Sequence, residues 1–333
     1  MPINISIKNV PDATADRLRA RAKQNHRSLQ GELLSVLEQA VNNTPIKTAR
    51  DLQSERHPGA LSTMAPANRP LAGPAFATDL IRTEIHGPVA TVILNRPEKL
   101  NALNLEMWAG VGGAFQALDE NTEIRCIILR GAGDKAVGPG ADITEFADKR
   151  NNSEQGADYG GVMHASMAAI RGCRHPVIAR IRGLCVGGAL ELALMCDLRI
   201  AGQGARFGVP INKLGLVMAH PETAALVGLV GPSLALEILY EARVFGAAEA
   251  LAKGLVNRVV ADEAVDTEIS ETAARICAGA PLVNRWHKKF VYEAASGKPP
   301  SDASEGFACF DTVDFQEGLR AFLAKETPDF KGK

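Results

Sequence analysis

The stretch Ile181-Arg-Gly-Leu-Cys-Val-Gly-Gly-Ala-Leu-Glu-Leu-Ala-Leu194 predicts a buried strand that turns into a helix at two adjacent glycines. A helix that begins at or near Gly188 has first-turn N–H groups without acceptors inside the helix, and its dipole adds partial positive charge there. Glycine at 187 and 188 lets a ligand approach this backbone, and Glu191 lies in the same turn. The stretch therefore predicts hydrogen-bond donors beside a carboxylate. Alternatively, the glycines only allow close packing and Glu191 only complements the dipole.

Predicted strands and helices alternate on both sides of this stretch. Residues 80–85 and 89–94 are predicted to pair around a His-Gly-Pro turn, and residues 124–129 and 177–181 are predicted to be buried strands. This alternation over some 250 residues indicates one α/β domain. The chain contains no Walker loop and no Gly-x-Gly-x-x-Gly fingerprint, which argues against nucleotide hydrolysis and dinucleotide redox chemistry.

A second backbone donor is predicted after the strand at 124–129. The turn Gly138-Pro-Gly-Ala-Asp142 exposes the N–H of Ala141 behind Gly140. Two N–H groups from separate loops, here those of Ala141 and Gly188, can converge on one carbonyl oxygen as an oxyanion hole, where each donor contributes roughly 3 to 4 kcal/mol to transition-state stabilisation. By itself, such a turn is also typical of an ordinary loop.

Together these motifs resemble the crotonase, or enoyl-CoA hydratase/isomerase, superfamily over residues 79–333. The matching motifs are Asn95-Arg-Pro-Glu-Lys-Leu-Asn-Ala-Leu103, Gly140-Ala-Asp142, Pro176-Val-Ile-Ala179, Gly183 to Glu191, Cys196-Asp197, Phe207-Gly208, Gly254-Leu-Val256 and Glu317-Gly-Leu-Arg-Ala-Phe322. The resemblance implies an α/β fold with a β-β-α spiral core and C-terminal helices.

The resemblance also implies roles for particular residues. The Ala141 and Gly188 N–H groups would hold the oxygen of an acyl-CoA thioester as an enolate forms, and Glu191 would be the first catalytic glutamate. Lys99 and Ala102 would lie beside the phosphate and adenine of CoA. Phe322 and Lys331 would lie near its nucleotide end, from this or a neighbouring subunit. Lys99 and Lys331 are equally explained as solvated surface charges.

The sequence departs from the family at the second catalytic glutamate. Hydratases of this family carry it after the Phe-Gly-x-Pro turn, where this chain has Ile211. Downstream, in place of the usual Gly-rich stretch, His220 and Glu222 add two titratable groups to a loop that should border the acyl pocket. Either they replace the missing glutamate, or Glu222 caps the helix from Thr223 onward and His220 is a surface histidine.

Three further polar residues, Asp142, Glu145 and His164, are weaker candidates and are predicted to be structural or exposed. No metal site is predicted, and no cofactor is expected because the CoA thioester is itself the substrate.

The N-terminal segment, residues 3–42, has a different pattern. Three alternating isoleucines at positions 3, 5 and 7 predict an amphipathic strand, two helices follow, and Ser28 is a good N-cap for the second. The segment resembles ribbon-helix-helix repressors of the Arc and antitoxin type, whose two-stranded ribbon enters the DNA major groove. Residues carried over are Asn4, Ser6 and Lys8 as base-facing positions, with the backbone at Arg27 and Ser28 as a phosphate clamp. The alternative is a dimerisation module without a DNA role.

The composition indicates where in the cell the protein is located and how the chain is divided into domains. The 333 residues are 46% hydrophobic with a net charge of −1, six scattered cysteines suggest a reduced, cytoplasmic protein, and no apolar run approaches the ~18 residues of a membrane span. Residues 1–50 hold eight basic and four acidic side chains. The predicted domains are 1–43, a ribbon-helix-helix module; 44–77, a Pro-containing linker in which Met64 is a possible second start; and 78–333, the acyl-CoA domain.

The sequence thus predicts a cytoplasmic enoyl-CoA hydratase or isomerase of fatty-acid metabolism that stabilises a thioester enolate, with Glu191 as acid/base. An acyl-CoA-responsive DNA-binding regulator with a weakly active or inactive domain is the alternative. The resemblance implies a homotrimer or a dimer of trimers, with possible DNA binding and no membrane partner.

Overall fold

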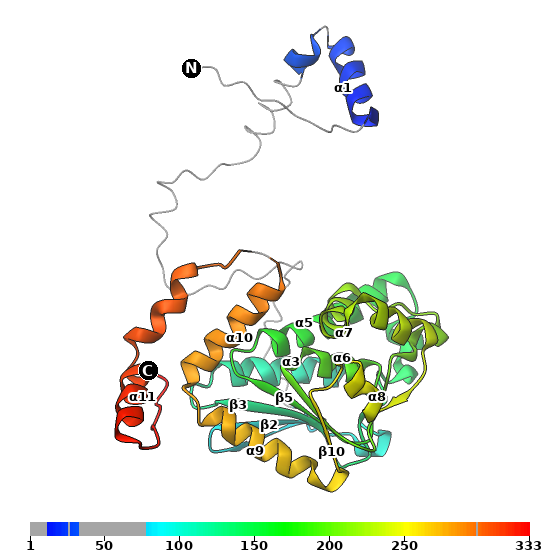
Figure 1. Cartoon of the computed structure of the whole chain (residues 1–333). Helices are drawn as coiled ribbons and strands as arrows, with labels where there is room; N and C mark the ends of the chain where they lie inside the picture. The colour runs from blue at the N-terminus through cyan, green and yellow to red at the C-terminus, as the bar shows by residue number, and fades with distance from the viewer. Residues whose placement is uncertain (1–11, 26, 33–77, 298) are drawn as a thin grey trace. The chain divides into compact units, whose positions relative to one another are not determined.

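The computed structural model describes residues 12–25, 27–32, 78–297 and 299–333 (Figure 1). The chain divides into two compact units, Met1–Leu71 and Ala72–Lys333. The boundary falls within the predicted linker, which itself lies outside the described residues. Each unit is therefore described by itself.

In the first unit, helix α1 spans Asp12–Gln24 and a second helix begins at Leu29. The Ser28 hydroxyl accepts a hydrogen bond from the Gly31 N–H at 3.1 Å, which confirms the predicted N-cap. The strand predicted over residues 3–8 lies outside the described residues, and so do Asn4, Ser6 and Lys8.

Three successive β-β-α turns build the second unit, so the predicted spiral is confirmed. In each turn the first strand joins a six-stranded sheet and the second joins a four-stranded sheet. The turns are β3 (Cys126–Gly131), β4 (Ala136–Gly138), α4 (Phe146–Lys149) and α5 (Ser153–Gly172); β5 (Val177–Ile181), β6 (Leu184–Val186) and α6 (Gly188–Met195); and β7 (Leu198–Gly202), β8 (Arg206–Gly208) and α7 (His220–Glu241).

The six-stranded sheet has the order β1-β2-β3-β5-β7-β10, and the smaller one β4-β6-β8-β9. Strands β1 (Ile81–His86) and β2 (Val89–Leu94) are the predicted antiparallel pair, and the other neighbours in the larger sheet are parallel. Strand β3 begins two residues later than predicted, because the chain at 121–124 forms a turn closed by the Ile124 N–H and the Asn121 carbonyl. Strands β9 (Phe245–Gly246) and β10 (Arg258–Val260) complete the two sheets.

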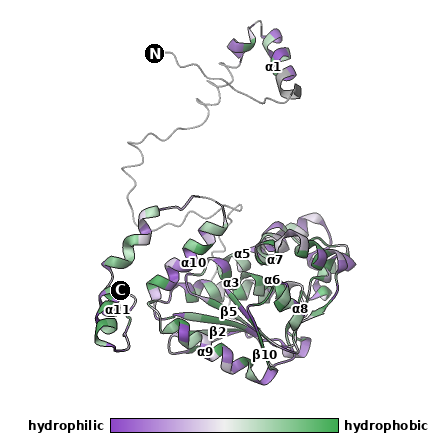
Figure 2. Ribbon diagram, in the orientation of Figure 1, coloured by the Kyte–Doolittle hydropathy of each residue, from purple (hydrophilic) through white to green (hydrophobic). Residues whose placement is uncertain are grey.

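The core lies between the larger sheet and helices α3 (Leu105–Glu120), α5 and α6. Trp108 and Phe115 on α3 are fully buried there, and Figure 2 shows hydrophobic residues along β2 and β5. The remaining elements are η1 (Pro97–Lys99), η2 (Ile143–Glu145), η3 (Pro210–Leu214), α8 (Ala247–Ala252), η4 (Asp262–Ala264), α9 (Val265–Cys277), α10 (Pro281–Ala295), η5 (Ala303–Asp311) and α11 (Val313–Ala324). The core therefore fixes α6 at the centre of the unit.

Helix α7 is interrupted at Gly231, where φ is +75°, just before Pro232. Among the described residues it is the one helix with the length and apolar composition of a membrane span. Its first turn, however, carries the buried carboxylate of Glu222 and contributes to the wall of a cavity. The helix is thus accounted for as part of the folded unit.

Candidate active site

The N-terminus of α6 forms one side of the candidate site. Gly187 adopts φ +52° and ψ −128°, a conformation that favours glycine, and this residue turns β6 directly into the helix. A Cβ at Gly188 would lie 2.9 Å from the Trp108 ring, so this position also requires glycine. Close packing, which is the predicted alternative, therefore does occur at Gly188. It adds to the exposed helix terminus rather than replacing it, because the Gly188 N–H still has no acceptor inside the helix.

The Ala141 N–H is oriented by its neighbours. The Leu103 N–H donates to the Gly140 carbonyl at 2.9 Å, and the Asp142 N–H donates to the Leu103 carbonyl at 2.8 Å. Because the Gly140 carbonyl and the Ala141 N–H belong to one planar trans peptide and point in opposite directions, the Ala141 N–H points away from Leu103. Gly140, at φ +118°, lies so close to α6 that a Cβ there would be 3.5 Å from the Gly188 nitrogen. The two predicted donors, the N–H groups of Ala141 and Gly188, therefore lie close together.

Both donors line one cavity of about 320 Å³. Its walls come from the loop before η2, the N-termini of α6 and α7, helices α4 and α5, and η3 with the chain that follows it. Members of the wall include Gly140, Ala141, Gly188, Glu191, Ile211 and Glu222. Five of the predicted site residues are thereby brought together, although they lie up to 81 positions apart in the chain.

Glu191 is only 5% exposed and faces this cavity from α6. Burial raises its pKa from 4.5 to about 7, and the negative charge of Glu222 adds to the effect, while Arg150 and His164 oppose it. Loss of solvation disfavours the ionised carboxylate. Glu191 is therefore a carboxyl group that can hold or release a proton near neutral pH.

This raised pKa predicts a pH-dependent cost in stability. The folded chain keeps the Glu191 proton up to about pH 7, whereas the unfolded chain releases it near pH 4.5, so stability is lost as pH rises between these values. The shift corresponds to at most about 3 kcal/mol. We expect Glu191→Gln to be more stable than the wild type in urea unfolding at pH 8 and equal to it near pH 4.5. An equal difference at both pH values, or one shared by the exposed control Glu154→Gln, would contradict this.

Glu222 supplies a second buried carboxylate, with 3% exposure. Helix α7 begins at His220 with Ala219 as its N-cap, and Glu222 lies inside the first turn without capping it. Its Oε1 lies 3.1 Å from Nε2 of His164 on α5, and its Oε2 is buried without a hydrogen-bond partner in the described part of the chain. The capping alternative is therefore wrong, and Glu222 offers an unpartnered carboxylate oxygen to the cavity.

His164 is a stronger candidate than its sequence context indicated. Its ring lines the cavity and its side chain is 35% exposed, so it connects the buried Glu222 with solvent. The hydrogen bond to Glu222 raises the pKa of His164, against the opposing effect of burial. No local motif signals this pairing, since 58 residues separate the two side chains.

The two titratable residues of the downstream loop, His220 and Glu222, face different surroundings. His220 is exposed at the start of α7 and is not among the residues that line the cavity, so its role as a catalytic group stays a prediction. The helix turns its side chain away when Glu222, two positions on, points inward. Ile211 does line the cavity, where it is half buried and contacts the core.

Two of the weaker candidates are structural, as predicted. Asp142 caps η2 through Thr144 and accepts a 2.7 Å bond from Arg96, and these partners hold the pKa of Asp142 down at about 2. Glu145 accepts a hydrogen bond from the Leu105 N–H at the start of α3. Both side chains therefore stabilise the loop that carries Ala141.

The residues predicted to contact CoA lie outside the cavity. Lys99 is exposed on η1, and the Ala102 carbonyl accepts a hydrogen bond from Arg96. Phe322 is 81% exposed on α11, and the Lys331 ammonium pairs with Asp329. Their roles toward CoA stay predictions, and so does the homotrimer, in which Phe322 would face a neighbouring subunit.

In the first unit, Glu32 is fully buried and its carboxylate lies 2.7 Å from Arg21 and 3.7 Å from Arg27. Arg27 thus has a partner within the module, while Ser28 serves as the N-cap. The predicted phosphate clamp at these two residues stays a prediction.

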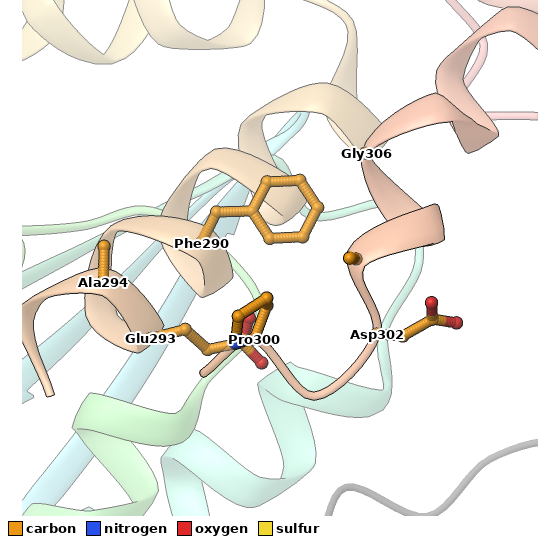
Figure 3. Close-up of a pocket in the computed structure, with 7 residues that line it drawn as sticks. Phe290, Glu293, Ala294, Pro300, Asp302 and Gly306 are labelled. Atoms are coloured by element: carbon orange, nitrogen blue, oxygen red, sulfur yellow. The ribbon is translucent and has the colours of Figure 1, made fainter. Parts of the chain in front are cut away.

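A second hollow, of about 330 Å³, lies between α10 and η5 (Figure 3). Phe290, Glu293 and Pro300 line it, and Asp302 caps η5 by accepting a bond from the Ser304 N–H. None of the predicted site residues lies there. Among the described residues, no cluster of three His, Cys, Asp or Glu side chains has the arrangement of a metal site.

Comparisons with known proteins divide the chain in the same way as its two units. The family model described as enoyl-CoA hydratase/isomerase matches residues 84–333, and that of the FitA-like ribbon-helix-helix antitoxins matches residues 4–41. The second match confirms the predicted N-terminal module.

Individual relatives agree with the larger match. A crotonyl-CoA hydratase of Syntrophomonas wolfei is 36% identical over 262 residues, covering 78% of this chain and 100% of the relative. A short-chain-enoyl-CoA hydratase of Clostridium acetobutylicum is 34% identical over 246 residues, covering 73% and 94%. A solved structure of an enoyl-CoA hydratase/carnithine racemase from Magnetospirillum magneticum is 50% identical, covers 77% of this chain and 97% of that chain, and has a TM-score of 0.76.

Proposed function

The chain belongs to the enoyl-CoA hydratase/isomerase family, and from that premise we propose that it is a cytoplasmic enzyme that adds water to the double bond of an enoyl-CoA. The Ala141 and Gly188 N–H groups bind the thioester oxygen. The observation that carries the proposal is the pair of buried carboxylates, Glu191 and Glu222, in the cavity that these N–H groups line.

The two carboxylates have different surroundings and therefore different roles. Glu222 has an unpartnered Oε2 that can accept a hydrogen bond from water, and its other oxygen is held by His164. As Glu222 takes a proton from this water, the oxygen adds to Cβ, and the double-bond electrons move through Cα to the thioester oxygen. Glu191, whose pKa of about 7 keeps a large protonated fraction at neutral pH, then donates its proton to Cα.

The developing negative charge on the thioester oxygen is stabilised by the two N–H groups and by the positive end of the α6 dipole. After product release, Glu222 holds a proton and Glu191 lacks one. His164, part buried and part exposed, can return the Glu222 proton to solvent, while Glu191 takes up another. No cofactor beyond the CoA thioester is required by this scheme.

Hydration of crotonyl-CoA by the full-length protein tests the proposal. We expect loss of the ultraviolet absorbance of the enoyl thioester, together with exchange of the Cα protons of bound butyryl-CoA into D₂O. Tight binding of either thioester with neither reaction would contradict the proposal and favour a regulator that only senses acyl-CoA.

A second candidate function, acyl-CoA-responsive DNA binding, is favoured by the N-terminal match to FitA-like antitoxins. It is compatible with the enzymatic proposal because the module and the cavity lie in different units. The test is DNA binding by the full-length protein with and without butyryl-CoA, compared with Lys8→Ala. Binding that ignores Lys8 and varies little with salt would contradict a ribbon-mediated contact.

A further inference from the structure

One cation in the cavity has no role in the scheme above. Arg150 follows α4 directly and lines the cavity with Phe146 and His164. Its guanidinium lies over two aromatic rings, 5.1 Å from the centroid of Phe146 and 5.3 Å from that of Tyr159. Two ring faces within about 6 Å hold a guanidinium by cation–π attraction. Arg150 is therefore a positioned cation in the wall of the cavity.

Among the described residues, no carboxylate pairs with Arg150. In the stretches 78–297 and 299–333, no Asp or Glu oxygen lies within 4.0 Å of its guanidinium. Buried Arg180, by contrast, pairs with Asp134 and Asp266, and Arg96 pairs with Asp142. Aromatic rings leave the N–H donors of a guanidinium unsatisfied in the plane of the group. Both of these other arginines are paired, and the absence of such a pair at Arg150 points to an anionic ligand.

The rest of the wall indicates which part of a substrate reaches Arg150. On the proposed function the thioester oxygen lies at Ala141 and Gly188, and the apolar side chains of Ile143, Leu216 and Met218 line the same cavity. An acyl chain that passes these apolar side chains toward α4 brings its far end to the guanidinium. Arginine binds a carboxylate there through two parallel hydrogen bonds.

We propose that Arg150 selects acyl-CoA substrates whose acyl chain ends in a carboxylate. The inference rests on the proposed function for its substrate class, since it assumes that the thioester is held at Ala141 and Gly188. Arg150 would also couple binding of the substrate carboxylate to protonation of Glu191. The charge of Arg150 lowers the pKa of Glu191, so a substrate carboxylate that neutralises this charge favours the protonated Glu191 that must donate to Cα.

Saturated thioesters test the selection without turnover. We compare the Kd values of succinyl-, glutaryl- and adipyl-CoA with those of butyryl-, pentanoyl- and hexanoyl-CoA, which match them in chain length. Calorimetry of the full-length protein should show at least one carboxylate-ended thioester binding about tenfold more tightly than its methyl-ended match. A methyl-ended thioester that binds as tightly at all three lengths overturns the inference.

Substitutions assign any preference to Arg150. In Arg150→Gln the preference should fall to about twofold or less, and Arg150→Lys should keep part of it, because lysine retains the charge without the planar pair of donors. Lys149→Gln removes a neighbouring exposed charge outside the cavity and should leave the preference unchanged. Unacylated CoA should bind Arg150→Gln as it binds the wild type. Weaker binding of free CoA to this variant would place Arg150 at the CoA phosphates and overturn the inference.

Different results would contradict the enzymatic proposal and the Arg150 subsite. A protein that prefers glutaryl-CoA but neither hydrates an enoyl-CoA nor exchanges Cα protons retains the Arg150 subsite and loses the enzymatic proposal. A protein that hydrates crotonyl-CoA while binding pentanoyl- and glutaryl-CoA equally, with the four- and six-carbon pairs behaving alike, retains the enzyme and loses the subsite.

Discussion

Replacing Glu191 by glutamine is expected to lower kcat/KM for hydration of crotonyl-CoA by on the order of 10³-fold, and to abolish Cα exchange in butyryl-CoA. Glutamine keeps the size and polarity of the side chain but has no acidic proton to give to Cα. In the proposed mechanism the thioester contacts at Ala141 and Gly188 are backbone groups, which this substitution leaves in place. Butyryl-CoA should therefore bind Glu191→Gln with a Kd close to that of the wild type.

The pH profile of the wild type gives an independent check on the same group. The proposed mechanism of hydration requires protonated Glu191, so kcat/KM should fall as pH rises through about 7, the pKa that burial gives this carboxyl. Exchange requires the ionised form and should rise over the same range. Glu154→Gln, the same chemical change on the exposed first turn of α5, serves as control. Full activity in Glu191→Gln would remove this residue from the mechanism.

Local sequence predicted the half of the site that depends on backbone geometry. The two glycines at 187 and 188 require a particular turn between a strand and a helix, and residues 140 and 141 require another, so both donors could be recognised from residue type and spacing. The strand at 177–181 and the start of α6 at Gly188 were likewise predicted at their observed positions. Such features depend on neighbours within a few residues.

The side chains of the site depend on which helices pack together. Local sequence patterns contain little information about that packing. Glu222 and His220 both suited the first turn of a helix, and only the packing of α7 against α6 decides that Glu222 points inward while His220 is exposed. His164 comes from the middle of α5, where nothing in the surrounding residues indicates a partner 58 positions away. Arg150 was not predicted at all, because an arginine after a short helix is typical of a surface charge.

Glu222→Gln is the second substitution with a large expected effect, and it separates the two carboxylates. Glutamine at 222 cannot take a proton from water, so hydration of crotonyl-CoA should fall about 10²-fold. Cα exchange in butyryl-CoA uses Glu191 alone and should fall much less. Because the charge of Glu222 helps to raise the pKa of Glu191, the midpoint of the exchange profile should move to lower pH in this variant. Equal losses in both assays would show that Glu222 only supports the fold.

Substitutions at Ile211 test whether Glu222 acts as the second catalytic carboxylate, which the family resemblance places at position 211. In the wild-type background, Ile211→Glu adds a third carboxylate to a cavity that already holds two, and their repulsion should lower hydration about tenfold. In the Glu222→Gln background the same change restores a pair, and hydration should recover above that of Glu222→Gln alone. Ile211→Gln controls for size and polarity in both backgrounds. If Ile211→Glu raises hydration while Glu222 is present, the wild-type site lacks a working base at 222, and the assignment of water activation to Glu222 is wrong.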